Sequence, residues 1–216
     1  AMNGSLRRLQ TDYIDIVFLH WPNRATNTLG QLDYKPAKKE RDTAAVTDDI
    51  FESLHVLQEM IQLGKVRYVG LSNETPWGVM QFLTMAEKSK LPKIVAVEEA
   101  YHLLNRRFDI GLAEIIDREH LGFFAYSPLA FGLLSEKHHQ AEGVLTDTRL
   151  GDTRKFHPFL SESCIQQAKK YVELAAKHSM DSAQMSIAYL LTRRYVTSVL
   201  VAASELTQLE DRKSVV

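Results

Sequence analysis

Short apolar runs alternate with longer amphipathic segments along most of the chain. Five runs are typical of buried strands, and polar residues follow each of them: DYIDIVFLHWP (12–22), VRYVGLSN (66–73), KIVAVEEAY (93–101), LGFFAYSPL (121–129) and VTSVLVAAS (196–204). Between the runs, apolar residues recur at helical spacing and predict helices over 48–65, 75–90, 112–116, 163–178 and 181–194, with another beginning at 207. This alternation indicates βα units and a parallel sheet covered by helices.

Several helix boundaries have chemical signals. Asp48 is a plausible N-terminal cap, and Gly64 is a plausible stop for the same helix. Thr75 and Pro76 form a cap and first-turn pair for the next helix. The polar segment 23–47 is too long for an ordinary connection, so it is either a flap over a site or a disordered insertion.

Composition narrows the class of protein. The chain has 216 residues, of which 45% are hydrophobic and 25% charged, so we expect one domain over 1–216. The formal charge of -1 favours a small-molecule or protein partner over nucleic acid or an anionic membrane. We expect a cytoplasmic protein, because no apolar stretch approaches the roughly 18 to 20 residues of a membrane span and AMNGSLRRLQ is not a signal peptide. Cys164 is the single cysteine, so an internal disulfide is excluded, and we interpret Cys164 as a structural residue.

The ends of the predicted strands carry the candidate chemistry. In parallel α/β folds, sites form at the carboxyl ends of strands, where loops vary without disturbing the sheet. The side chains predicted at this rim are donors, acceptors and aromatics: His20-Trp21, Ser72-Asn73, Glu98-Glu99, Tyr126-Ser127-Pro128 and Ala203-Ser204.

Each rim residue has a functional and a structural interpretation. His20 can donate a hydrogen bond to a substrate oxygen, or it can cap a strand end by bonding a backbone carbonyl. Ser72 and Asn73 suit a planar amide, although such a pair is also ordinary turn chemistry. Tyr126 can stack on a ligand ring, or it is an ordinary half-buried aromatic.

Other features are interpreted as unrelated to function. His138 and His139 are adjacent, so they cannot easily face one metal ion from a helix, and we expect no metal site. The segment KPAKKERD mixes charge signs and is typical of a solvated loop. The sequence has no G-x-G-x-x-G or P-loop, so any phosphate must be held by other means.

Several motifs together resemble a known family. SLRRLQTDYIDIVFLHWP, GKVRYVGLSNETPWGV, YHLLNRR, AYSPLAFGLLSEK and DSAQMSIAYLLTRRYVTSVLVAASELTQLED occur in the order and spacing of the aldo-keto reductase superfamily. The resemblance is to the branch with bacterial Tas-type and potassium-channel β-subunit-like proteins. It implies a TIM-type (β/α)8 barrel, of which this chain covers about strands 4 to 8, and NADPH as cofactor.

The resemblance also implies roles for single residues. His20 orients the substrate carbonyl, and Trp21 lines the substrate pocket. Ser72, Asn73 and Glu98 face the nicotinamide, and Tyr126 stacks on its ring. The positions that hold the pyrophosphate are Ser127, Pro128, Leu129 and Gly132. The positions that hold the adenosine 2′-phosphate end are Ser204, Gln208 and Arg212. The implied activity is reduction of aldehydes or ketones to alcohols.

Departures from the family pattern support an alternative. The aspartate, tyrosine and lysine of the family's catalytic tetrad have no match in residues 1–216, so we expect the chain to be truncated at both ends and inactive by itself. Glu98 stands where the family usually has a glutamine, and Glu136 replaces a glycine. The alternative is a non-catalytic NADP(H)-binding regulatory or interaction subunit. Five strands do not close a barrel, so self-association through open edges is expected.

Overall fold

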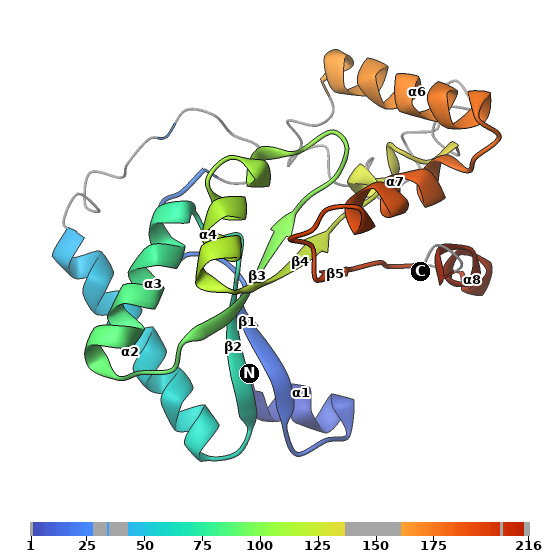
Figure 1. Cartoon of the computed structure of the whole chain (residues 1–216). Helices are drawn as coiled ribbons and strands as arrows, with labels where there is room; N and C mark the ends of the chain where they lie inside the picture. The colour runs from blue at the N-terminus through green and yellow to red at the C-terminus, as the bar shows by residue number, and fades with distance from the viewer. Residues whose placement is uncertain (1, 28–33, 35–42, 137–160, 204, 214–216) are drawn as a thin grey trace. The chain divides into compact units, whose positions relative to one another are not determined.

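The computed structural model describes residues 2–27, 34, 43–136, 161–203 and 205–213 (Figure 1). The chain forms two compact units, the first from residues 1–26, 34–98 and 111–122, and the second from 27–33, 99–110 and 123–216. The ends of the predicted flap are described, but its central residues 28–33 and 35–42 lie outside the described part, as do His138 and His139.

The first unit alternates strands with helices, as the apolar pattern predicts. Its elements are α1 (Met2–Leu9), β1 (Ile14–Leu19), α2 (Thr43–Gln62), β2 (Val66–Ser72), α3 (Pro76–Ser89), β3 (Ile94–Ala100), whose end belongs to the second unit, and α4 (Leu112–Glu119). β1 pairs with β2 and β2 with β3, both in parallel. Figure 1 shows α2 and α3 side by side next to these strands. The predicted parallel arrangement is confirmed for these strands.

The core of the first unit forms from the sheet and the apolar stripes of its helices. In β2 the four consecutive residues from Val69 to Ser72 are buried, so both faces of this part of the strand are covered, as is typical of parallel sheets. α2 and α3 supply buried side chains at helical spacing: Ile50, Leu54, Leu57, Val79, Phe82, Leu83 and Ala86. The buried positions of both helices therefore follow the 3.6-residue period of an amphipathic helix.

Two helix starts show how local signals compare with the structure. Thr75 caps α3, since its side chain accepts from the Gly78 amide at 3.1 Å and Pro76 follows at the first helical position. Asp48, in contrast, is not the cap of α2, because the helix already begins at Thr43. The segment between Thr43 and Thr47 contains alanines, which favour helix, and it extends the helix by a turn.

The second unit combines a short parallel strand pair with helices. Its elements are η1 (Arg107–Asp109), most of β4 (Gly122–Tyr126), η2 (Ala130–Gly132), α6 (Glu162–Lys177), α7 (Ser182–Leu191), β5 (Ser198–Val199) and α8 (Leu206–Lys213). β4 and β5 pair in parallel. β5 is shorter than the predicted run over 196–204, because its ladder ends where the Leu200 amide bonds the Ala125 carbonyl oxygen and the residues beyond it are exposed.

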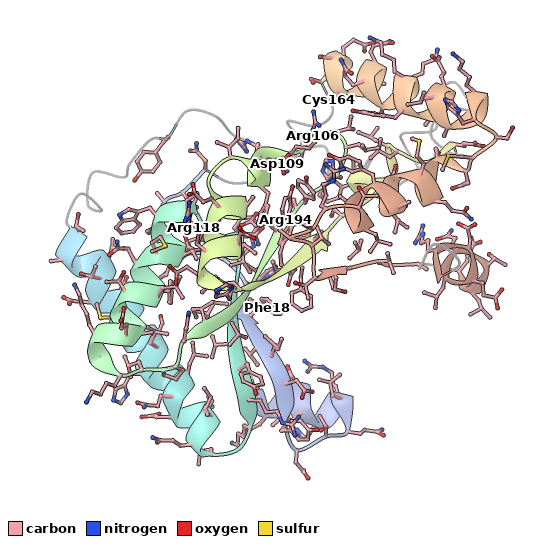
Figure 2. All side chains as sticks on the ribbon, viewed as in Figure 1. Phe18, Arg106, Asp109, Arg118, Cys164 and Arg194 are labelled. Carbon is pink, nitrogen blue, oxygen red and sulfur yellow. The ribbon has the colours of Figure 1, made fainter. Side chains whose placement is uncertain are left out.

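An aromatic cluster with one acceptor forms a rigid part of the second unit. Phe108 and Phe123 stack at 3.6 Å between ring centroids, and Tyr101 meets both rings edge-on. The Tyr101 hydroxyl donates to Asp109 Oδ1 at 2.8 Å, and Tyr195 bonds the same carboxylate. Figure 2 labels Asp109 at this turn. Burial raises the pKa of both phenols, that of Tyr195 to about 12, so both remain donors at neutral pH.

None of the described helices is long and apolar enough to cross a membrane.

His102 is fully buried in the second unit, directly after Tyr101. Its backbone exchanges two hydrogen bonds with Asn105, and the Asn105 side chain donates to the Ala100 carbonyl oxygen at 3.0 Å. Burial lowers the pKa of His102 to about 4, because the imidazolium ion loses its hydration. The folded protein therefore holds this imidazole neutral at physiological pH.

We predict that acidification destabilises the protein through His102. The unfolded chain binds a proton at its ordinary pKa of about 6.5, whereas the folded protein binds it only near pH 4, so the contribution is complete above pH 6.5 and is lost as the pH falls toward 4. The loss is at most about 3 kcal/mol. Urea unfolding of wild type and His102→Asn across this range measures it.

His120→Asn is a matched control for this prediction. His120 is exposed and ends α4 in the left-handed conformation with φ 55°, which asparagine adopts readily. The pH dependence of its free energy of unfolding should match that of wild type, while His102→Asn should show a flatter one. Equal slopes for wild type and His102→Asn would contradict the prediction.

Candidate functional site

The ends of β1 and β2 bring His20 and Ser72-Asn73 together. Leu19 and Leu71 are partners in the parallel register, so the residues that follow them leave the sheet side by side. The side-chain amide of Asn73 donates to the His20 carbonyl oxygen at 2.8 Å and to Ser72 Oγ at 3.1 Å. Two of the predicted rim positions are therefore joined by a direct hydrogen bond.

Asn73 also joins β2 to β3. Its backbone is left-handed, with φ 58°, a conformation that asparagine tolerates better than most residues. In this conformation the backbone amide of Asn73 donates to the Glu98 backbone carbonyl oxygen at 3.0 Å. Three strand ends of the first unit thus meet at Asn73, which explains why a short amide residue stands there.

His20 and Trp21 lie beside this turn and reach solvent. Both are exposed, and their ring centroids are 6.1 Å apart. Among the described residues, no backbone carbonyl oxygen accepts a hydrogen bond from the His20 imidazole, whereas the backbone of His20 is held by Asn73. The imidazole is therefore accessible to a ligand while its main chain is fixed.

Glu98 brings a titratable carboxyl to the same strand ends. Its side chain is half-buried on β3. Burial raises the pKa of the Glu98 carboxyl above its ordinary value, and the nearby His20 imidazole lowers it by a smaller amount. The protonated carboxyl can donate a hydrogen bond, while the ionised carboxylate only accepts.

A buried ion pair stands next to these residues, and the sequence interpretation did not identify it. Arg24 and Glu74 bond at 2.5 Å between Nη2 and Oε1 and at 3.0 Å between Nη1 and Oε2. Arg24 also donates to Thr75 Oγ1 at 3.0 Å. The sequence carries two signals of an unusual turn, since Glu74 directly precedes the Thr75-Pro76 helix start and Gly78 lies in the first turn of that helix. These signals do not identify Arg24, because it lies 50 residues away from Glu74.

A pocket of about 230 Å³ opens at this place in the first unit. Its lining includes His20, Trp21 and Ser72 from the predicted rim. Arg24, Asp49 and Glu74 line it as well, and Leu71 and Phe82 provide apolar walls. The pocket therefore combines an accessible imidazole and a hydroxyl with the buried Arg24-Glu74 ion pair and the exposed carboxylate of Asp49.

The loop after β4 carries the predicted residues of the second unit. Tyr126 ends β4 and is half-buried, and its carbonyl oxygen accepts from the Tyr101 amide at 3.3 Å. Ser127 and Gly132 have φ values of 55° and 107°, and Ala130 and Phe131 between them are also left-handed. Such conformations cost energy for residues with a side chain and are concentrated at ligand-binding loops. Pro128 is buried in this loop, and Leu129 is half-buried.

α8 carries two of the remaining predicted residues. Gln208 and Arg212 are both partly buried on this helix, and Arg212 donates to the Ala202 carbonyl oxygen. Ser204 lies outside the described residues. The structure thus places Gln208 and Arg212 one turn apart on α8.

No group of three potential metal ligands occurs among the described histidine, cysteine, aspartate and glutamate residues. Cys164 is half-buried in the first turn of α6, where the Ser161 side chain caps the helix by accepting from its amide (Figure 2).

Comparisons with known proteins match the whole chain. The model of the Aldo/keto reductase family matches residues 1–216. Protein tas of Escherichia coli strain K12 is 38% identical over 215 residues, which are 97% of this chain and 59% of that protein. An aldo-keto reductase of Babesia bovis is 30% identical over 98% of this chain and 76% of its own length. An L-glyceraldehyde 3-phosphate reductase of Escherichia coli strain K12 is 29% identical over 98% of this chain and 56% of its own length.

The family match agrees with the described architecture. The chain spans about three fifths of the length of protein tas, the first of these relatives. The family fold is a (β/α)8 barrel, and the described strand pairs are parallel and alternate with helices as that fold requires. Family members are oxidoreductases. With a family model that matches every residue and a relative 30% identical over most of its length, this chain belongs to the aldo/keto reductase family.

Proposed function

We propose that the protein is an NADPH-dependent reductase that converts aldehydes or ketones to alcohols. The observation that carries this proposal is the joined group of His20, Ser72 and Asn73 at the ends of β1 and β2. It presents an accessible imidazole beside a polar pair, on a chain of the aldo/keto reductase family. A carbonyl substrate needs a hydrogen-bond donor at its oxygen, and a nicotinamide needs partners for its carboxamide.

The hydrogen bonds of Ser72 and Asn73 fit a carboxamide. Both amide hydrogens of Asn73 Nδ2 are directed to protein acceptors, the His20 carbonyl oxygen and Ser72 Oγ. Asn73 Oδ1 can then accept from a ligand amide, and the Ser72 hydroxyl, which accepts from Asn73, can donate to a ligand carbonyl oxygen. The pair thus offers one acceptor and one donor, the complement of the nicotinamide carboxamide.

The chain's own residues then have separate roles in the reaction. NADPH, when bound, supplies the hydride. The His20 imidazole donates a hydrogen bond to the substrate carbonyl oxygen and stabilises the negative charge that develops there. Its main chain is fixed by Asn73, so the imidazole is positioned before the substrate arrives. The exposed indole of Trp21 lies beside it and contacts the substrate.

We assign the cofactor's other groups to residues of the second unit. Tyr126 stacks on the nicotinamide ring, and Ser127, Pro128, Leu129 and Gly132 contact the pyrophosphate. The left-handed φ values at Ser127 and Gly132 support a loop shaped for a ligand. Ser204, Gln208 and Arg212 hold the adenosine 2′-phosphate.

Residues 1–216 by themselves are proposed to be a poor catalyst. The tyrosine that donates the proton, with its aspartate and lysine, has no match in these residues. A second candidate function follows from Glu98 and Glu136, which stand where the family usually has a glutamine and a glycine. In this alternative the protein binds NADP(H) without turnover and acts as a regulatory subunit.

Titration of the 216-residue chain with NADPH separates these proposals. We expect saturable binding, followed by nicotinamide fluorescence, and little or no carbonyl reduction. Light scattering in the same samples tests the predicted self-association. Rapid reduction of aldehydes by this chain would exclude both the poor-catalyst proposal and the regulatory alternative, and absence of binding at high micromolar NADPH would contradict the proposed cofactor site.

His20→Ala tests the proposed role of the imidazole. In the full-length protein we expect kcat for carbonyl reduction to fall by about a hundredfold, because a general acid-base or oxyanion group contributes at least that much. The Kd for NADPH should change little, since Ser72 and Asn73 bind the carboxamide. A large loss of NADPH affinity with unchanged kcat would show that His20 belongs to the cofactor site instead.

Glu98→Gln tests the carboxyl at the cofactor site. In wild type, NADPH affinity should fall as the pH rises through the raised pKa of Glu98, because the ionised carboxylate no longer donates. The glutamine variant should bind NADPH about fivefold more tightly at neutral pH, the equivalent of about one hydrogen bond, and lose this pH dependence. The Kd for NADPH of both proteins, measured from about pH 5 to 8, tests this prediction. Identical pH profiles of the two Kd values would contradict it.

A further inference from the structure

Arg24 makes a two-pronged ion pair that links two segments far apart in the sequence. Its Nη1 donates to Glu74 Oε2 at 3.0 Å, and its Nη2 donates to Glu74 Oε1 at 2.5 Å. Paired bonds of this kind fix the relative orientation of the two groups as well as their distance. Arg24 belongs to the segment after β1, while Glu74 belongs to the turn after β2.

The pair is almost completely removed from solvent. The exposed fractions of the two side chains are 11% for Arg24 and 3% for Glu74. Burying two charges costs hydration energy, which the attraction between them often only offsets, so an apolar pair of similar size would stabilise the fold as well. A contribution to the stability of the fold therefore does not explain the pair well. The better explanation is the relative orientation that the pair imposes on the two segments.

The further contacts that the Arg24 guanidinium makes with described residues come from the start of α3. Nη2 donates to Thr75 Oγ1 at 3.0 Å, and this hydroxyl also accepts from the Gly78 amide as the N-terminal cap. The guanidinium carbon lies 5.1 Å from the ring centroid of Trp77, within the range of a cation-π contact. Arg24 is thus held by charge, hydrogen bonds and an aromatic face at once.

Gly78 leaves the space that this arrangement needs. A Cβ atom at this position would lie 2.1 Å from Glu74 Oε1 and 2.4 Å from Arg24 Nη2, far inside contact distance. Glycine within a helix costs about 1 kcal/mol relative to alanine, so its presence in the first turn of α3 calls for a reason. The ion pair supplies that reason.

The positions in the sequence connect the pair to the candidate site. His20 lies four residues before Arg24, and Asn73 directly precedes Glu74. The same two segments are joined a second time by the hydrogen bond from Asn73 to the His20 carbonyl oxygen at 2.8 Å. We propose that Arg24 is a positioning residue, whose ion pair with Glu74 holds the segment that carries His20 against the turn that carries Ser72 and Asn73.

This inference rests on the proposed function for its catalytic meaning, and its test has one readout that does not. The test uses Arg24→Lys in the full-length protein, since lysine keeps the charge but cannot make the forked contact. We expect the Kd for NADPH to rise by about tenfold, because the turn that carries Ser72 and Asn73 is no longer held and the loss of about one hydrogen bond to the carboxamide has an effect of this size. The NMR signal of the His20 imidazole, assigned from its loss in His20→Ala, should shift.

Arg67→Lys is the matched control. Arg67 also pairs with a carboxylate, Asp15, at 2.8 Å between β2 and β1, but both side chains are more than half exposed. This variant should leave NADPH affinity and the His20 signal unchanged. If Arg24→Lys does not fold, Gly78→Ala tests the same pair, because the added methyl group displaces both charged side chains.

The outcomes separate the two proposals. If wild type binds no NADPH, the proposed function fails, and the His20 signal alone decides whether Arg24 positions that residue. A folded Arg24→Lys variant with an unshifted His20 signal, and with NADPH affinity within about twofold of wild type where wild type binds, would overturn the inference. A shift of the His20 signal in Arg24→Lys but not in Arg67→Lys supports it.

Discussion

The hydrogen bond from the Asn73 side chain to the His20 carbonyl oxygen depends on the parallel pairing of β1 with β2, and the candidate site depends on both. Because Leu19 and Leu71 are partners in the register, the residues after them leave the sheet together, and a shift of one residue would turn each side chain to the opposite face. Close packing at Gly70 opposes such a shift, since a Cβ atom at this position would lie 2.4 Å from the Phe18 ring. Packing of the core thus fixes the spacing of the polar residues at the strand ends.

The polar side chains of the turn after β2 are connected by hydrogen bonds that give its buried donors partners. Thr75 Oγ1 meets the guanidinium of Arg24 and caps α3 at the same time, and the Glu74 carboxylate accepts from the Thr75 amide at 2.6 Å as well as from Arg24. Such networks are stabilising only when every member is satisfied, because a single lost partner leaves a desolvated charge. The turn after β2 is therefore a rigid element, and rigidity is what a site needs to hold an imidazole in place.

The second unit achieves rigidity by different means. Stacked and edge-on aromatic rings surround the Asp109 carboxylate, which accepts hydrogen bonds from Tyr101 and Tyr195. His102 follows Tyr101 and is held neutral by burial. The loop after β4 adds several left-handed residues, whose conformational cost must be offset by the packing around them. Leu133 and Leu134 supply part of that packing, in an apolar cluster with Ala130 and Ala168.

The sequence by itself determined the alternation of strands and helices, the cap at Thr75, and the strand ends at which His20 and Ser72-Asn73 stand, because these follow from local periodicity and turn chemistry. It did not determine the start of α2 or the length of β5. A helix start without a clear cap leaves no local signal, and the end of β5 depends on where its ladder with β4 stops. Only the tertiary structure decided that Arg24 and Glu74 meet, that Gly78 makes room for them, and that His102 is buried. Those contacts join residues far apart in the chain or depend on the surrounding packing, and no periodic pattern encodes them.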